Sequence, residues 1–241
     1  MKNIFKLNEQ IEDTQKMIAN TQKLLEENEN DSILRFMLSQ DKSLLKQLKK
    51  QRTQELLEYL KNIESSADTI LNDVYGEMAF HIDPFYMANK MGIDVVKNSD
   101  MGEKEAGKCY VLDDIITIEY KPQISHNRER FTVAHELGHI IKHMPYANNV
   151  HFEDSEELLY ARSDYIDSAN SQEMEADRLA GELLIPKKTV LYLLNSLEPS
   201  ERLSTKMLQD LFKVSEGAIY HALKSYELLY HTQIKREFSW L

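Results

Sequence analysis

Three histidines spaced four residues apart stand in the stretch TVAHELGHIIKHMPY, residues 132–146. His135, Glu136 and His139 form the pattern His-Glu-x-x-His within it. On an α-helix, residues i and i+4 lie about 40° apart around the axis, so His135 and His139 could present their imidazoles to one metal ion. Glu136 would flank that ion and act as a general base on an activated water. The spacing therefore predicts a metal-dependent hydrolytic site on a helix.

Such a site needs a third protein ligand, and two routes to one predict different sequences. A third histidine in a longer motif would stand ten residues after His135, where Pro145 is found. A glutamate from a second helix should be followed four residues later by Asp or Asn. The stretch SQEMEADRLAGELLIP offers this pair as Glu173 and Asp177. We predict that Glu173 completes the metal site and that Asp177 orients an imidazole from behind.

Glu175 is the competing carboxylate on the same predicted helix. It lies two residues after Glu173, about 200° around the axis, so the two carboxylates cannot both face one ion. Asp177 shares a face with Glu173, which favours Glu173 as the ligand. The alternative is that Glu173 only caps its helix by reaching back to Asn170, as in a capping box. Under that alternative, Glu173→Ala would lower stability slightly and leave bound metal unchanged.

Other polar residues near the motif are candidates for further roles at the site. His143 would lie about 80° from His135 around the helix and close to Pro145. We interpret it as a helix-terminal histidine that interacts with the helix dipole, the alternative being a hydrogen-bond donor to a developing oxyanion. The sequence does not rank the further candidates for that donor, which are His126, His151, Tyr160 and Tyr165.

Two predicted helices must position these side chains. The HELGH helix should begin at Ser125 or Asn127 and run to Pro145. The Glu173 helix should begin at Asn170 or Ser171 and end at Pro186. Gly138 lies inside the first helix, where glycine costs about 1 kcal/mol relative to alanine. This glycine indicates close packing at that point, or else is simply tolerated.

Upstream elements complete an α+β order. Residues 67–80 predict a helix, and a short second helix should begin at Asp83 and end at Gly92. GIDVV has strand character. The runs CYVL and IITIEY predict a β-hairpin joined by Asp113 and Asp114. Because the remainder is helical, we predict a small sheet followed by helices.

The first 62 residues form a separate region in the sequence. Their apolar residues recur at 3/4/7 spacing, and Asp31 can cap a second helix, which predicts an all-α coiled-coil arm, either an antiparallel helical hairpin or a bent coiled coil. We therefore divide the chain into an arm, 1–62, and a second domain, 63–241. The arm is interpreted as a spacer or as a means of forming a homo-oligomer, and the alternative is a substrate-recognition arm.

Composition and charge exclude several functional classes. Cys109 is the single cysteine, so there is no disulfide framework or thiolate zinc cluster, and a cytoplasmic location is expected. No apolar run reaches the roughly 18–20 residues of a membrane span. The net charge is −11, and residues 1–62 hold 11 basic and 10 acidic residues, so the acidic excess lies in the second region. This charge argues against direct nucleic-acid binding and mildly favours a basic protein partner.

Two further segments carry weaker signals. Residues 151–170 are acidic, and we interpret them as a rim or lid that suits a basic substrate, the alternative being a solvated loop. The segment LSTKMLQDLFKVSEGAIYHALKSYELL resembles a helix-turn-helix. Residues 201–231 balance four basic against four acidic residues, whereas a helix that reads DNA should be basic. We therefore favour a packing element.

The motifs RFTVAHELGHIIKH and EMEADRLAGELLIP together resemble the ImmA/IrrE family of zinc metallopeptidases, over about residues 66–230. The resemblance implies a gluzincin-like minimal metallopeptidase domain with one zinc ion per chain. His135, His139 and Glu173 would be the ligands and Glu136 the catalytic base. Asp177 stands where that family more commonly has Asn, and its charge should make its imidazole partner more basic.

The same resemblance implies an activity and a partner. The chain would be a zinc-dependent endopeptidase that cleaves a helix-turn-helix repressor of a mobile element or stress response. The alternative belongs to a different functional class, a metal-binding regulatory protein that sequesters a repressor without cutting it. The two are distinguished by whether the partner becomes shorter.

Overall fold

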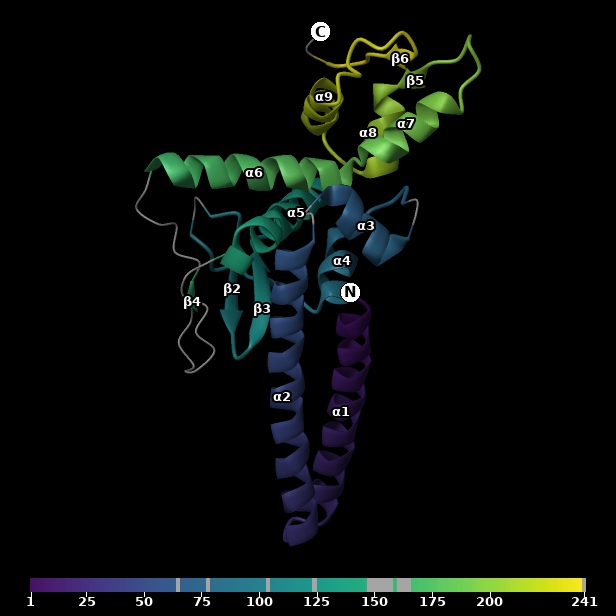
Figure 1. Cartoon of the computed structure of the whole chain (residues 1–241). Helices are drawn as coiled ribbons and strands as arrows, with labels where there is room; N and C mark the ends of the chain where they lie inside the picture. The colour runs from purple at the N-terminus through teal and green to yellow at the C-terminus, as the bar shows by residue number, and fades with distance from the viewer. Residues whose placement is uncertain are drawn as a thin grey trace.

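The computed structural model describes residues 1–63, 66–76, 79–102, 105–122, 125–146, 158–159 and 166–239. Figure 1 shows a pair of long helices that extends away from a body built of shorter helices and a small sheet. This arrangement confirms the predicted α+β class. Among the described helices, none combines the length and apolar character needed to cross a membrane.

The two long helices form the predicted antiparallel hairpin (Figure 1). Helix α1 spans Lys2–Glu27 and helix α2 spans Ser32–Asn62. Asp31 caps α2, since its Oδ1 accepts hydrogen bonds from the backbone N–H groups of Ile33 (2.8 Å) and Leu34 (3.1 Å). The residues of α1 that are buried along the seam are Ile4, Leu7, Ile11, Thr14, Ile18 and Thr21.

The base of the hairpin is packed into the body. Ile4 and Leu60 belong to the same apolar cluster as Ile118 of the sheet. In addition, the Thr53 hydroxyl donates to the backbone carbonyl of Asp114 at 2.6 Å. The division into an arm and a second domain stays a prediction, because the proximal part of the arm shares its core with the rest of the chain.

The sheet lies against the helix that carries the His-Glu-x-x-His motif. Its strand order is β1-β3-β2-β4, with β1 parallel to β3 and the other pairs antiparallel. Asp113 and Asp114 have φ values of 50° and 62°, as a two-residue type I′ hairpin turn requires, so the predicted hairpin forms. The strands are β1 Asp94–Lys97, β2 Gly107–Leu112, β3 Ile115–Tyr120 and β4 Leu158–Leu159.

Helices α3 and α6 differ from the predicted boundaries. Helix α3, Ala67–Tyr75, is shorter than predicted because Gly76 adopts φ 89°, which ends the helix. Helix α6 spans Ile166–Leu184, so the predicted start at Asn170 or Ser171 is wrong. A cap preference is worth only about 1 kcal/mol, and the preceding residues contain no glycine or proline to stop a helix.

The other helices follow the predicted pattern except at the end of α5, which stops at Lys142 and does not reach Pro145. Asp83 caps α4 through the Phe85 backbone N–H, and Gly92 closes it in the left-handed region at φ 78°. A short 3₁₀ turn, η1 at Met144–Tyr146, follows α5. These helices are α4 Pro84–Met91, α5 His126–Lys142, α7 Lys187–Asn195, α8 Thr205–Phe212 and α9 Glu216–Ser225.

Helices α8 and α9 close a second apolar core at the C-terminal end of the chain. Phe212 and Ile219 of this pair are fully buried together with Ala134 of α5 and Leu184 of α6. Two short parallel strands, β5 Leu203–Ser204 and β6 Ile234–Lys235, lie beside them. The pair therefore packs against the two helices that carry the predicted metal ligands.

Arg130 is a buried cation that holds α5 to its surroundings. Its Nη2 donates to the backbone carbonyl of Ile82 at 2.6 Å and to that of Phe212 at 3.2 Å. Arg130→Met should lower the free energy of unfolding by about 3 kcal/mol, because two buried carbonyls lose a charged donor. Urea denaturation of the metal-free protein measures this loss.

Arg128 supplies the matched control, since it is an exposed arginine two residues earlier on the same helix. Arg128→Met should change stability by no more than about 0.5 kcal/mol. Equal losses in the two variants would show that the Arg130 contacts do not stabilise the fold.

Candidate metal centre

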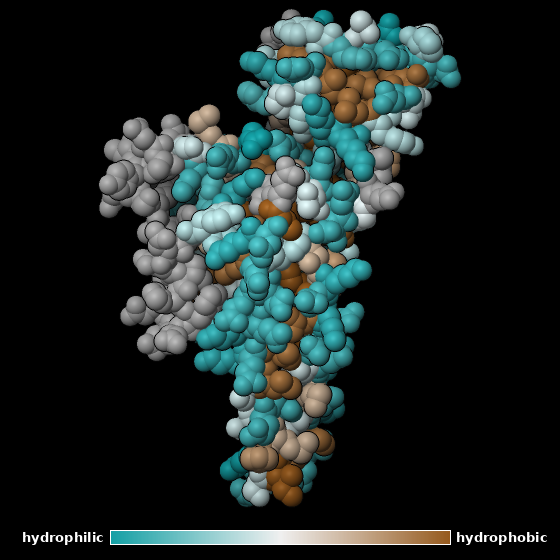
Figure 2. Space-filling view, viewed as in Figure 1, coloured by the Kyte–Doolittle hydropathy of each residue, from teal (hydrophilic) through white to brown (hydrophobic). Residues whose placement is uncertain are grey.

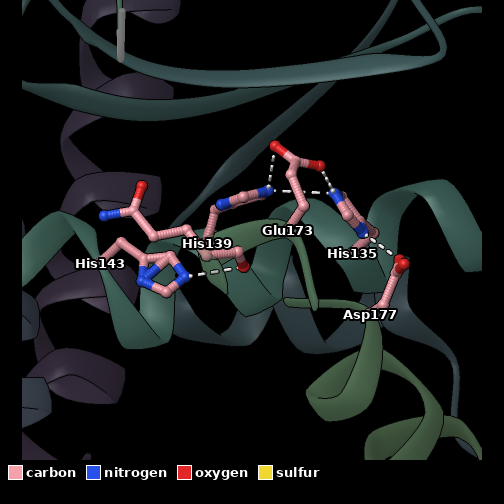
Figure 3. Close-up of polar contacts among 6 residues, drawn as sticks. His135, His139, His143, Glu173 and Asp177 are labelled. Atoms are coloured by element: carbon pink, nitrogen blue, oxygen red, sulfur yellow. Dashed lines mark hydrogen bonds and ion pairs between the residues drawn. The ribbon is translucent and has the colours of Figure 1, made fainter. Parts of the chain in front are cut away.

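Helices α5 and α6 bring three predicted ligands together (Figure 3). The Nε2 atoms of His135 and His139 lie 3.0 Å apart. Glu173 of α6 places Oε2 at 3.3 Å from His135 Nε2 and Oε1 at 3.5 Å from His139 Nε2. One ligand atom from each residue lies within 4.8 Å of the others, so the group could hold a metal ion.

These separations fit a tetrahedral ion. With metal–ligand bonds of about 2.0–2.1 Å, two ligand atoms at the corners of a tetrahedron lie about 3.3 Å apart. The two nitrogens lie 3.0 Å apart, and each nitrogen has one of the two Glu173 oxygens near that value, Oε2 at 3.3 Å from His135 and Oε1 at 3.5 Å from His139. Two imidazole nitrogens and one carboxylate are also the ligand types of open catalytic zinc sites. The residues present therefore fit a divalent metal, with a corner left for water or substrate.

Asp177 fixes the orientation of His135. Its Oδ1 lies 2.7 Å from His135 Nδ1, on the side of the ring that faces away from the cluster (Figure 3). An ionised carboxylate can only accept a hydrogen bond, so Nδ1 carries the proton and the lone pair of Nε2 points toward the ligand cluster. Asp177 therefore contacts one of the two imidazoles, as predicted from its position four residues after Glu173, and that imidazole is His135.

Gly138 allows the two helices to approach closely. A Cβ on Gly138 would lie 2.8 Å from the backbone oxygen of Ala176 and 2.9 Å from its Cα. Gly138 stands between His135 and His139 in the sequence, and Ala176 follows Glu173 by three residues. Of the two interpretations of this glycine, close packing is the correct one, and the contact joins the two helices that carry the predicted ligands.

Glu136 is buried next to the sheet. Only 6% of its surface is exposed. A Cβ on Gly107 of β2 would lie 2.9 Å from Glu136 Oε1, so the carboxylate rests directly against the start of this strand. Burial, together with the nearby Glu136 carboxylate that accepts its hydrogen bond, raises the pKa of the Cys109 thiol well above its usual value. The thiol therefore stays protonated and can donate to Glu136.

Sequence reasoning missed Gly107 and Cys109 as neighbours of the predicted base. The two residues alternate along one strand and therefore face the same side of the sheet. The glycine at the beginning of the strand GKCYVL was the available signal, since glycine in a strand often marks a close approach of another group.

His143 supports α6 and is not part of the ligand cluster. Its Nε2 donates to the backbone carbonyl of Gln172 at 3.1 Å, one residue before Glu173 (Figure 3). Burial lowers the pKa of His143, although the carboxylates of Glu175 and Glu173 partly oppose this shift. The ring is therefore neutral at neutral pH and holds the backbone next to Glu173, the predicted third ligand.

Of the other candidates for an oxyanion donor, the structure describes only His126, and it does not bring that residue to the site. His126 lies at the surface, where Nδ1 is 3.3 Å from Glu129 Oε2 and the ring stacks on Phe85. His151, Tyr160 and Tyr165 lie outside the described residues, as does nearly all of the acidic segment interpreted as a rim or lid.

Comparisons with known proteins agree with the motifs. The family model described as IrrE N-terminal-like domain (Peptidase_M78) matches residues 88–224. No curated protein matches significantly. Among solved structures, a Mycobacterium tuberculosis transcriptional regulator matches with a TM-score of 0.44 and 14% identity, covering 73% of this chain and 52% of that one. This chain thus spans about half the length of that regulator. Because the family model covers more than half of the sequence, including His135, His139 and Glu173, the chain belongs to the Peptidase_M78 family.

Proposed function

We propose that this chain is a zinc-dependent endopeptidase that hydrolyses peptide bonds in a protein substrate. The observation that carries the proposal is the convergence of His135, His139 and Glu173 at separations that suit a tetrahedral ion. A peptidase family supplies the reaction class. When bound, zinc would supply Lewis acidity toward the scissile carbonyl and toward the attacking water.

Glu136 is the residue to which we assign proton transfer. It follows His135 directly, so the two side chains project from neighbouring positions of α5. In the proposed reaction, its carboxylate removes a proton from the attacking water and returns that proton to the departing amine. The Cys109 thiol keeps the carboxylate in place, and Asp177 keeps the proton of His135 on Nδ1.

The proposed substrate is a helix-turn-helix repressor of a mobile element or stress response. Membership of the IrrE-like family supports this assignment. The acidic character of the chain beyond the arm would attract a basic partner such as a DNA-binding domain and would disfavour direct binding of nucleic acid. Homo-oligomerisation through the N-terminal arm remains a prediction.

Glu136→Gln separates the chemistry from metal binding. The variant should retain close to one zinc ion per chain and cleave no detectable substrate, because the amide cannot accept the proton of water. The measurement combines metal analysis with gel electrophoresis of a helix-turn-helix repressor incubated with the protein. Cys109→Ser, which keeps a hydroxyl donor beside Glu136, is the control and should remain active.

Retained cleavage by Glu136→Gln would remove Glu136 from the reaction. A repressor that binds stoichiometrically to the zinc-loaded wild type without being shortened would contradict the protease and support the sequestering protein instead. Wild-type protein that contains no zinc, with metal content unchanged in His135→Ala, would contradict the metal centre itself.

A further inference from the structure

An apolar groove lies beside the metal centre, between the first half of α5, α6 and α9. Its volume is about 920 Å³. Phe131 of α5, Gly181 of α6 and Ala218 and Ala222 of α9 are among the residues that line it. In Figure 1, α9 lies on the side of α6 opposite the sheet, so the groove is separate from the sheet that contacts Glu136. A volume of this size exceeds what one side chain fills and suits a segment of polypeptide.

One face of α6 connects the groove to the metal centre. Glu173, Asp177 and Gly181 follow each other at four-residue spacing and therefore lie along one side of the helix. Asp177 holds His135 through its carboxylate and also lines the groove. A substrate segment seated in the groove would thus lie next to the ligand cluster on the same helix.

Two glycines show that the groove is open space. A Cβ added to Gly181 of α6 or to Gly217 of α9 would meet no atom within 4 Å. Both residues line the groove. By contrast, a Cβ on Gly138 would collide with the backbone of α6. The groove is therefore not filled by the chain's own described side chains, and a Cβ can be added at either of two walls without a clash.

Charge at the rim indicates what the occupant carries. Arg178 pairs with Glu182 at 2.9 Å, and Asp177 is engaged by His135. The exposed Arg128 side chain has no hydrogen bond or ion pair with any residue that the structure describes. The charge left available at the rim is thus a guanidinium, which a carboxylate on the occupant would satisfy.

The walls favour a helical occupant over an extended one. The lining residues belong to α5, α6, α9 and the residues adjoining their ends, so no strand edge offers backbone partners to an extended peptide. A helix satisfies its own backbone hydrogen bonds and needs only an apolar surface to bury. The small side chains on the α9 wall, Ala218 and Ala222, leave room for such a helix to approach.

We propose that this groove is an exosite that binds an amphipathic helix of the protein substrate. The apolar face of that helix lies against Phe131 and α9, and a carboxylate at its edge meets Arg128. The proposal rests on the proposed protease function, because the bound helix serves to deliver a neighbouring segment of the substrate to the metal centre.

Binding tests the exosite without requiring cleavage. The probe is a displayed library of amphipathic helical peptides, selected on the full-length, zinc-loaded Glu136→Gln variant. Selected peptides should share large apolar residues at helical spacing and an acidic residue at the edge. Adding Gly181→Leu or Gly217→Leu should lower the affinity for the selected peptides by about 10- to 100-fold, because each leucine occupies the space of one apolar side chain. Fluorescence anisotropy measures this affinity. Lys206→Leu, on the exposed side of α8, is the matched control and should leave affinity unchanged.

Charge reversal tests the second part of the proposal. Arg128→Glu should weaken the binding of the selected peptides, and changing the acidic residue of the peptides to lysine should restore it. No enrichment of helical peptides, or equal affinity for the parent and both leucine variants, would overturn the exosite.

The protease and the exosite can fail independently. If the helices bind in the groove but no repressor is ever cut, the protease proposal falls and the binding site remains. If a repressor is cut by Gly181→Leu and Gly217→Leu as fast as by wild type, the exosite is wrong and the protease remains. Circular dichroism and thermal unfolding of both leucine variants establish that they are folded.

Discussion

Glu173→Ala should remove most of the zinc from the protein, whereas Glu175→Ala should leave it bound. Both oxygens of Glu173 face the cluster, at 3.3 Å from His135 Nε2 and 3.5 Å from His139 Nε2. Loss of an outer partner of a metal ligand already lowers metal affinity by roughly 10–100-fold, so loss of a ligand should cost more than about 100-fold. Competition with a chelator of known affinity measures the change.

Glu175 is the matched control because it is an exposed glutamate on the same helix, about 200° around the axis from Glu173. The zinc affinity of Asp177→Ala should lie between those of Glu173→Ala and Glu175→Ala, reduced roughly 10–100-fold, because the substitution releases His135 without removing a ligand. Equal zinc affinity in wild type and Glu173→Ala, or loss in Glu175→Ala alone, would show that the third ligand is assigned wrongly.

The alternative role of Glu173 as a helix cap predicts a different pattern. Helix α6 begins at Ile166, so Glu173 lies in its interior and not in its first turn. A capping residue would change stability by about 1 kcal/mol without changing zinc affinity. Thermal unfolding of the metal-free variants therefore distinguishes a cap from a ligand.

Local periodicity explains which parts of the site the sequence predicts. His135 and His139 share a turn of one helix, and Glu173 and Asp177 share a turn of another, so each pair is fixed by helical geometry alone. Capping residues such as Asp31 and Asp83 act within three residues, which explains why the starts of α2 and α4 follow from the sequence.

The residues that were not predicted depend on contacts between distant elements. Gly107 and Cys109 reach Glu136 only because β2 packs on α5, and no local pattern encodes that packing. The groove beside Gly181 likewise requires α9 to lie over α6. The segment between η1 and α6 carries few periodic apolar residues, so its interpretation as a lid stays a prediction.

Gly138→Ala should disrupt the metal centre without altering any ligand. Its new Cβ would lie 2.8 Å from the Ala176 oxygen, whereas ordinary contacts begin at 3.4 Å, so α6 must move outward by about half an ångström or more. This movement separates Glu173 from His135 and His139. Alanine regains about 1 kcal/mol of helix propensity, but overpacking costs typically 1–3 kcal/mol, so the variant without metal should be slightly less stable than wild type. Its affinity for zinc should also be lower.

Gly181→Ala is the control that isolates the steric effect. It makes the same substitution inside α6, but its Cβ would meet nothing within 4 Å. This variant should gain up to about 1 kcal/mol of stability from helix propensity and keep its zinc affinity. The contrary result is that Gly138→Ala behaves like Gly181→Ala, with higher stability and unchanged zinc affinity. That result would show that the distance between the two imidazoles and the carboxylate does not depend on the close approach of α5 and α6. If Gly138→Ala alone loses zinc, helix spacing is as necessary to the site as the ligands themselves.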